Sequence, residues 1–297
     1  MINDSIAIGA DIGGTHITAA LVDLKEKKIL PGSFIREKVD SHGSQEQIME
    51  VWSQAILKVR QDLNVNKVSL AMPGPFDYDK GICLIKNQNK YENLYGLNIK
   101  ELLAAKLKNE PKDISMVNDA ASFLQGEVFG GAASGFKNVI GLTLGTGLGT
   151  CTYHNGKASN ANLWQHPFKE GIAEDYLSTR WFTKRYHEIT GININGVKEL
   201  AELAGKDPRV KRIFNEFGNN LGEFLTEFAS LAHPEVVILG GNIAKSFRLF
   251  KRTLLTNIQN KFPEIKIKVA VLGEEAALMG AASYWKNNTH QNKNLPV

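Results

Sequence analysis

The spacing of apolar and polar residues divides the first part of the chain into alternating strands and helices. Two apolar alternating runs in "SIAIGADIGGTHITAALVDL" predict two strands joined by a glycine-rich turn. Residues 44 to 63 instead carry apolar side chains at helical spacing up to Leu63, and Ser44 with Gln47 forms a capping-box start. A strand in "KVSLAMPGP", a helix in "NIKELLAAKLK" capped by Asn98, a strand in "ISMVND" and a helix in "AASFLQGEVFGG" follow.

The opening pattern returns at residue 138, where "NVIGLTLGTGLGTCTYHNGK" again predicts strand, glycine-rich turn and strand. Two copies of one hairpin indicate an internal duplication. Helices are predicted at 170–189 and 210–232, then strands in "EVVILGG" and "IKIKVAVL" and a last helix in "EEAALMGAASYW". The helix predicted at 210–232 carries an apolar stripe of Phe214, Phe217, Leu221, Phe224, Leu225, Phe228 and Leu231.

This order of elements predicts an α/β chain of two domains. No low-complexity linker marks a boundary, so we place it at a tight crossover near residues 117–120. Residues 1–117 form the smaller domain and residues 118–283 the larger one. A C-terminal helix at about 284–297 is expected to pack back on the smaller domain.

Both glycine-rich turns have the composition of an anion site. "DIGGT" brings Asp11 to the end of a strand, followed by Gly13, Gly14 and Thr15. Adjacent glycines allow positive φ and bring backbone N–H groups close to an anion. The second turn, "LGTGLG", contains Gly145, Thr146 and Gly147. The alternative is a pair of ordinary hairpin turns. Neither is a Walker A loop or a dinucleotide fingerprint, because Gly-Lys-Ser/Thr is absent and a strand follows each turn.

Charge and cysteine content bear on the ligands and the cellular compartment of the protein. The net charge of +4 is spread along the chain without a basic block, which gives no support to nucleic-acid binding. Cys83 and Cys151 lie far apart, so a disulfide framework is not expected and a reducing compartment is. The N-terminus lacks the features of a signal peptide, and no apolar run approaches the roughly 20 residues that span a bilayer. We expect a cytoplasmic protein without membrane contact.

The segment "NLWQHPFKEGIAEDYLS", residues 162–178, crowds four ionisable candidates together. His166, Glu170, Glu174 and Asp175 have the chemistry of metal ligands. The same side chains could bind the hydroxyls of a polar substrate, or form a solvated helix surface. The segment alone leaves all three interpretations open.

Taken in order, seven segments resemble the sugar kinases of the ROK family (repressors, open reading frames and kinases), and the resemblance is glucokinase-like. They are "DIGGTHITAALVD", "AMPGPFD", "NLYGLNIKELL", "VNDA", "LTLGTGLG", "HPEVVILGGNI" and "AALMGAA", which span nearly the whole chain. The resemblance implies the actin-like ATPase (ribonuclease H-like) fold, with two α/β domains around a central cleft. It also implies ATP and Mg²⁺ as cofactors and a homodimer.

Within the resemblance, Asp119 is the base that accepts the proton of the attacking sugar hydroxyl. Local sequence alone leaves Asp119 as a helix cap. Asn118, Gly74 and Asn93 would line the sugar pocket. The two glycine turns would bind the phosphates, with Asp11 orienting Mg²⁺ or its water. Gly240 and Gly241, after a buried-type strand, would contact adenosine through the backbone, although a plain tight turn is the alternative.

The chain departs from the family where the zinc cluster of one histidine and three cysteines is expected. "GIAEDYLS" keeps the glutamate of the family motif as Glu174, while Ile172 replaces the last cysteine. Asn162 stands near the place of a pocket glutamate and His166 near that of the family histidine, which makes both further candidate sugar ligands. One histidine with scattered carboxylates does not supply tetrahedral zinc ligands, so we predict no zinc and expect Trp164, Pro167 and Phe168 to order this loop by packing.

Three functions therefore stand at the level of sequence. The first is ATP-dependent phosphorylation of the primary hydroxyl of a hexose, with glucose foremost. The second is an N-acetylhexosamine kinase acting on N-acetylmannosamine or N-acetylglucosamine. The third is a non-catalytic sugar sensor or regulator, which the presence of Asp11 and Asp119 disfavours. The phosphate donor could also differ from ATP.

Overall fold

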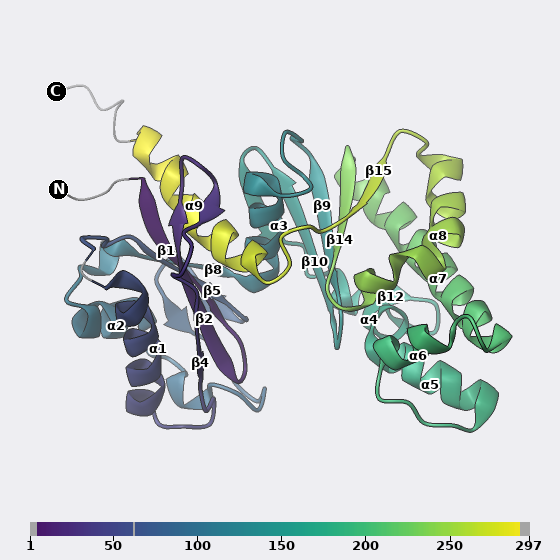
Figure 1. Cartoon of the computed structure of the whole chain (residues 1–297), viewed down its shortest axis with the longest axis horizontal. Coiled ribbons are helices and arrows are strands. Elements are labelled where there is room, and N and C mark those ends of the chain that lie inside the picture. Colours follow the sequence, from purple (N-terminus) through teal and green to yellow (C-terminus); the bar gives the residue numbers. More distant parts are fainter. Residues whose placement is uncertain (1–4, 62, 292–297) are drawn as a thin grey trace. The chain divides into compact units, whose positions relative to one another are not determined.

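The computed structural model describes residues 5–61 and 63–291, and these form two compact units (Figure 1). Unit 1 comprises Met1–Gly131 together with Glu274–Val297, and unit 2 comprises Ala132–Gly273. The division differs from the boundaries expected from sequence: the segment after residue 117 stays with unit 1 up to Gly131. The C-terminal helix rejoins unit 1 earlier than expected, from Glu274, and residues 292–297 lie outside the described part.

A mixed sheet forms the centre of unit 1. Its strands are β1 (Ile6–Ile12), β2 (His16–Asp23), β3 (Lys28–Ile29), β4 (Ile35–Lys38), β5 (Val68–Met72) and β8 (Ile114–Asn118). They follow the order β3-β2-β1-β5-β8, with β4 also paired to β2. β1 is antiparallel to β2 and parallel to β5, which is parallel to β8. The smaller elements are β6 (Phe76–Asp77), β7 (Ile82–Cys83), η1 (Glu92–Leu94) and η2 (Pro111–Asp113).

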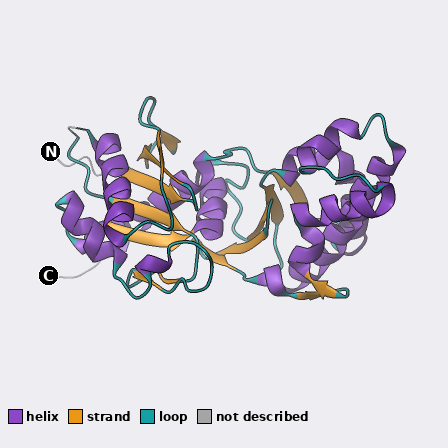
Figure 2. Ribbon diagram, turned by 90° about the horizontal axis from the view of Figure 1, so that it is seen from below, coloured by secondary structure: helices purple, strands orange, loops and turns teal. Residues whose placement is uncertain are grey.

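Helices cover both faces of this sheet (Figure 2). They are α1 (Gln45–Arg60), α2 (Ile99–Leu107), α3 (Asp119–Gly130) and α9 (Glu275–Gln291). Ile8 and Ala10 of β1 share a buried cluster with Trp52 of α1. Gly9 lies against the backbone of Leu278 in α9. Since successive side chains of a strand point to opposite faces, Asp11 belongs to the face that carries α9.

Helix α1 begins as its sequence predicts. The side chain of Ser44 accepts the N–H of Gln47 at 3.3 Å, and the side chain of Gln47 accepts the N–H of Ser44 at 2.8 Å. The helix ends at Arg60. Leu63 therefore lies outside the apolar face to which its spacing assigned it, and its side chain is exposed.

A close crossing of α3 and α9 explains why α3 belongs to unit 1. A Cβ atom on Gly126 would overlap the backbone carbonyl of Ala276, and one on Gly280 would overlap that of Ser122. Glycine at these two positions lets the helix backbones touch. The contact joins segments about 150 positions apart in the chain, which local sequence patterns do not report.

We expect Gly126→Ala to lower the free energy of unfolding by about 1–3 kcal/mol, because overpacking the crossing outweighs the higher helix propensity of alanine. Denaturant unfolding of both proteins measures the difference. Gly205→Ala is the matched control, since a Cβ on Gly205 would meet no atom within 4 Å. Equal stability of Gly126→Ala and wild type would contradict the close crossing.

Unit 2 repeats the sheet of unit 1. Its strands are β9 (Val139–Leu144), β10 (Leu148–His154), β11 (Lys157–Asn160), β14 (Val236–Gly240) and β15 (Lys266–Val269). Their order is β11-β10-β9-β14-β15, with an antiparallel β9–β10 hairpin and parallel β9–β14 and β14–β15 pairs. This order matches β3-β2-β1-β5-β8 strand for strand. The duplication seen in the hairpins thus extends over five strands.

The remaining elements of unit 2 pack on one face of its sheet. They are η3 (Leu163–Gln165), β12 (Pro167–Phe168), β13 (Gly171–Ile172), α4 (Ala173–Leu177), α5 (Thr179–Thr190), α6 (Val197–Leu203), α7 (Pro208–Ala232), η4 (Ile243–Ser246) and α8 (Phe247–Lys261). Phe182, Phe214, Phe217 and Phe250 form an aromatic centre. The helix expected at 170–189 is two helices, and Leu231, assigned to the apolar stripe of α7, is 71% exposed.

Candidate active site

The turn between β1 and β2 consists of Gly13, Gly14 and Thr15. The N–H of Gly13 donates to the carbonyl of His16 at 2.9 Å and closes the turn. The N–H groups of Gly14 and Thr15 donate to no atom of the described residues, and both residues are exposed. The buried hydroxyl of Tyr91 donates to the carbonyl of Gly13 at 2.5 Å. The turn therefore presents two unpaired N–H donors on a fixed backbone, as an anion site requires.

Open space, rather than unusual backbone angles, accounts for the glycines of this turn. Gly13 and Gly14 do not have positive φ, so that part of the sequence interpretation is wrong. A Cβ on Gly14 would meet no atom within 4 Å, and the same holds for Gly145 in the second turn. The protein's own packing does not require glycine there. A side chain would occupy the space in which a ligand can approach the backbone.

The turn between β9 and β10 has a similar construction. The N–H of Gly145 donates to the carbonyl of Gly147 at 3.1 Å, and Thr146 is exposed at the tip. Thr179 donates to the carbonyl of Gly145 twice, from its N–H at 2.8 Å and its hydroxyl at 2.9 Å. In both turns a distant hydroxyl thus holds the carbonyl of the first glycine. Sequence patterns did not single out Thr179 or Tyr91, because their partners lie 34 and 78 positions away.

Two acidic side chains lie within electrostatic reach of each other in unit 1. The pKa of Asp11 is raised to about 6, first by burial and then by the charges of Asp119 and Glu274. Arg36, which pairs with Glu274 at 3.2 Å, partly offsets this rise. Burial also raises the pKa of Asp119, although a hydrogen bond from the N–H of Ala120 at 2.8 Å opposes it. A site that brings ionisable carboxylates together with raised pKa values is typical of a functional centre.

Asn118, rather than Asp119, caps α3. The side-chain oxygen of Asn118 accepts the N–H of Ala121 at 3.2 Å, while Asp119 is the first residue of the helix. The local interpretation of Asp119 as a helix cap is therefore wrong. The carboxylate of Asp119 is not needed to cap the helix.

Tyr78 links two predicted sugar-pocket residues and was not found from the sequence. The amide of Asn118 donates to the hydroxyl of Tyr78 at 3.2 Å, and this hydroxyl donates to the carbonyl of Met72 at 3.1 Å. A Cβ on Gly74 would lie 3.1 Å from the same hydroxyl. Burial raises the pKa of Tyr78 to about 12, so it remains a neutral donor at physiological pH. Gly74 and Asn118 thus lie together around one phenol.

Asn93 is engaged in loop contacts. Its amide donates to the carbonyls of His42 and Gly43 at 3.0 and 2.9 Å, which ties η1 to the loop before α1. The residue itself is exposed. A role for Asn93 in sugar binding stays a prediction.

Glu174 lies against the second glycine turn. Its carboxylate accepts the N–H of Leu148 at 3.0 Å and pairs with Arg180 at 2.7 Å. A Cβ on Gly147 would lie 2.7 Å from the same carboxylate. Each oxygen has one protein partner here and keeps a further acceptor site for a sugar hydroxyl. Arg180, largely exposed, is a cation next to this turn that sequence patterns did not reveal.

The other candidates of the acid-rich segment have separate partners. His166 approaches Glu227 of α7 at 3.2 Å, and Asp175 accepts the N–H of Ile172 at 3.1 Å. Asn162 has a left-handed backbone and directly precedes η3. Over residues 5–61 and 63–291, no group of three or more His, Cys, Asp or Glu side chains is placed to hold a metal ion. The direct metal-ligand interpretation of this segment has no geometric support.

Packing orders the loop at residues 162–169 through one residue of the three expected. Phe168 is buried and contacts the rings of Tyr176 and Phe224 at centroid distances of 5.6 and 6.1 Å. Trp164 is 39% exposed and Pro167 is also exposed. Phe168 therefore anchors the loop.

Gly241 follows β14 with φ of +83°, and a Cβ there would overlap the backbone of Leu144 at the end of β9. Packing alone thus requires glycine at this position. Gly240 is buried and pairs with Thr143. The adenosine contact of both glycines stays a prediction. None of the described helices is both long and apolar enough to cross a membrane.

Comparison with protein families identifies the family to which this chain belongs. The ROK family model matches residues 7–162 and 169–288, which include both glycine turns and Asp119. This chain belongs to the ROK family. The match is interrupted between residues 162 and 169, in the segment that contains His166. As a ROK protein, the chain has the actin-like ATPase fold.

ROK sugar kinases are similar to the chain over almost its whole length. Glucokinase of Thermotoga maritima is 24% identical over 94% of this chain and 96% of its own. N-acetylgalactosamine kinase AgaK of Shewanella sp. (strain ANA-3) is 24% identical over 92% of this chain and 94% of its own. The structure of a ROK family glucokinase from Streptomyces griseus in complex with glucose and AMPPNP superimposes with a TM-score of 0.75, at 24% identity over 95% of this chain and 99% of that one.

Proposed function

We propose that this sugar kinase transfers the γ-phosphoryl group of ATP to the primary hydroxyl of a hexose, with glucose as the first substrate. One observation carries the proposal: Asp119 and Asp11 meet electrostatically in unit 1, at a glycine turn with two unpaired N–H groups. Phosphoryl transfer needs a base for the hydroxyl and donors for the phosphate, and these groups supply both. The glucose and AMPPNP bound by the Streptomyces griseus relative agree with this assignment.

In the proposed reaction, Asp119 accepts the proton of the sugar hydroxyl as its oxygen attacks the γ-phosphorus. The bond from phosphorus to the bridging oxygen breaks, and ADP leaves. Burial raises the pKa of Asp119, which makes its carboxylate a stronger base than an exposed aspartate. The Ala120 N–H, at 2.8 Å, holds the carboxylate in place.

The N–H groups of Gly14 and Thr15 would bind phosphate oxygens, and so would the second turn through Thr146 and Gly147. These residues fit a phosphate, because open space surrounds the backbone of the first turn at Gly14. Mg²⁺ would supply positive charge that neutralises the phosphates. Asp11 would hold water of that ion, and a cation there would relieve the repulsion that raises the pKa of Asp11. We assign Gly240 and Gly241 to adenosine.

As sugar ligands we assign Asn118, Gly74, Asn93 and Glu174. The Tyr78 hydroxyl fixes the amide of Asn118, so its orientation is set before sugar binds. Asn162 and His166 are further candidates, and both lie at or inside the interruption of the family match. Specificity would be expected to differ from relatives there. We also propose a homodimer, which rests on family membership.

A second candidate is an N-acetylhexosamine kinase. The named N-acetylgalactosamine kinase relative is as similar to this chain as the named glucokinase is, at 24% identity each. A regulator without turnover is a third, but an intact pair of Asp11 and Asp119 argues against it.

A coupled ADP-release assay over a hexose panel separates the three functions. Sugar-dependent ADP release with glucose or mannose supports a hexokinase, whereas release confined to N-acetylglucosamine, N-acetylmannosamine or N-acetylgalactosamine supports the second function. We expect release with glucose and a 6-phosphate product by NMR. Binding of a sugar without ADP release, also when inorganic polyphosphate replaces ATP, would reject both kinases.

We further propose that the protein functions without zinc. Ile172 stands in place of a cysteine, and the nearest histidine, His166, faces Glu227. Metal analysis of the purified protein should find far less than one zinc per chain, and full activity should persist after treatment with a zinc chelator and addition of Mg²⁺. About one equivalent of bound zinc would reject this part of the proposal.

A further inference from the structure

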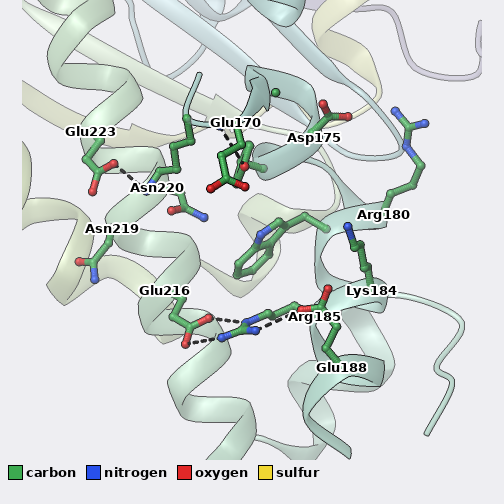
Figure 3. A pocket seen from close by; sticks show the side chains of 14 residues that line it. Glu170, Asp175, Arg180, Lys184, Arg185, Glu188, Glu216, Asn219, Asn220 and Glu223 are labelled. Atoms are coloured by element: carbon green, nitrogen blue, oxygen red, sulfur yellow. Dashed lines mark hydrogen bonds and ion pairs between the residues drawn. The ribbon is translucent and has the colours of Figure 1, made fainter. Parts of the chain in front are cut away.

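A pocket of about 950 Å³ lies wholly within unit 2, and no residue of either glycine turn lines it (Figure 3). Its walls come from α5, α7 and the segment 169–176. This volume is at the upper end of the range for small-molecule sites, about 300–1,000 Å³. The phosphoryl-transfer chemistry proposed above gives this pocket no task.

The charges that line the pocket are nearly balanced, with five carboxylates and four cationic side chains. Most of them neutralise one another. Arg185 contacts Glu216 at 2.7 Å and Glu188 at 3.1 Å, and Lys169 contacts Glu223 at 2.8 Å. A wall of this kind does not attract a polyanion such as a nucleotide, and it suits a neutral ligand.

Three polar side chains are left unpaired at the pocket. Asn220 of α7 is only 8% exposed, and its amide makes no hydrogen bond with any described residue. Figure 3 shows this amide pointing into the pocket in the direction of Glu170. The Glu170 carboxylate and the Lys184 ammonium also have no hydrogen bond or ion pair with any of the residues that the structure describes. The amide atoms of Asn220 are open to the pocket, since they are not among the fully enclosed side-chain atoms without a partner, and a ligand there can form hydrogen bonds with them.

An aromatic ring completes the site. Trp181 lines the pocket and packs against Phe182 and Phe217, with centroid distances of 5.1 and 5.9 Å. These contacts hold the indole rigidly. An indole face is apolar and carries negative charge density, which suits the C–H face of a sugar ring.

We infer that this pocket is a second carbohydrate site, separate from the site of phosphoryl transfer, which takes a neutral mono- or disaccharide. One face of the sugar ring lies on Trp181. Its hydroxyls donate to Glu170, accept from Lys184 and do both with the amide of Asn220. Sugar binding at this pocket requires no kinase activity, so the inference does not depend on the proposed function.

Isothermal titration with glucose, N-acetylglucosamine, maltose and cellobiose tests the inference on the whole chain. For at least one of these sugars, wild type should bind one equivalent more than Asn220→Leu, which keeps a similar volume but cannot form hydrogen bonds. Glu170→Ala, a change at an exposed position, should weaken the same equivalent by about tenfold or more. Asn215→Ala, on α7 but outside the pocket, should bind like wild type.

Turnover in the ADP-release assay should be the same in Asn220→Leu and wild type, which separates this site from the catalytic one. The inference is overturned if Asn220→Leu and Glu170→Ala bind every sugar with wild-type stoichiometry and affinity. It is also overturned if Glu170→Ala changes only the sedimentation of the protein, because the pocket then holds a second copy of the chain.

Discussion

Asp119→Asn should remain folded and lose nearly all sugar-dependent ADP release, with kcat about 10²–10⁴-fold below wild type. Asparagine keeps an oxygen that can accept the N–H of Ala120, so the start of α3 is preserved. Its amide cannot take up the proton of the sugar hydroxyl. Steady-state kinetics with saturating ATP and sugar measure the loss, and circular dichroism checks the fold.

Glu275→Gln is the matched control for this variant. Glu275 is the first residue of α9 in the same unit, it is exposed, and it also places a carboxylate in the first turn of a helix. Its removal should leave kcat unchanged. If Asp119→Asn kept more than about a tenth of wild-type kcat, its barrier would lie within ~1.4 kcal/mol of wild type and the role of base would be excluded.

The elements that the sequence predicts well are those whose signals are local. The capping box at Ser44, the cap at Asn98 and both strand-turn-strand hairpins depend on residues a few positions apart, and the structure confirms each. The ends of elements do not follow from local spacing alone. Leu63 and Leu231 continue a helical spacing, yet the first follows a helix that has ended and the second lies on an exposed side of α7.

Contacts between distant segments leave no signal in the local sequence pattern. The hydroxyls of Tyr91 and Thr179 each hold a glycine turn from far along the chain, and neither residue belongs to a periodic pattern. The α3–α9 crossing is of the same kind, since Gly126 has meaning only once Ala276 is beside it. Asp11 is the last residue but one of β1 and Asp119 directly follows β8, so both belong to the sheet whose order follows from the fold; their catalytic roles stay predictions.

Asp11→Asn should make the protein more stable at pH 7 and less active. The pKa of Asp11 is about 6 in the folded protein, against 3.8 for an ordinary aspartate, because burial and the charge of Asp119 disfavour its ionised form. A neutral amide does not carry this cost. We expect the free energy of unfolding to rise by about 1–3 kcal/mol at pH 7. We expect kcat to fall by about tenfold or more, since the amide no longer balances the charge of Mg²⁺.

The pH dependence of this stability difference tests its electrostatic origin. Below pH 3.8 the carboxyl is protonated in both the folded and the unfolded wild type, so wild type and variant should unfold with similar free energies. Between pH 3.8 and about 6 the unfolded wild type loses its proton first, so wild type loses stability relative to the variant. Above pH 6 the difference should stay constant. Urea unfolding at pH 4, 5, 6 and 7 measures this curve, and a difference that is independent of pH would mean that the ionisation of Asp11 does not oppose folding. The negative charges of Asp11 and Asp119, which repel each other, would also attract a cation to the phosphates. A variant that is more stable but inactive would therefore indicate that the ionised Asp11 lowers stability and is needed for catalysis.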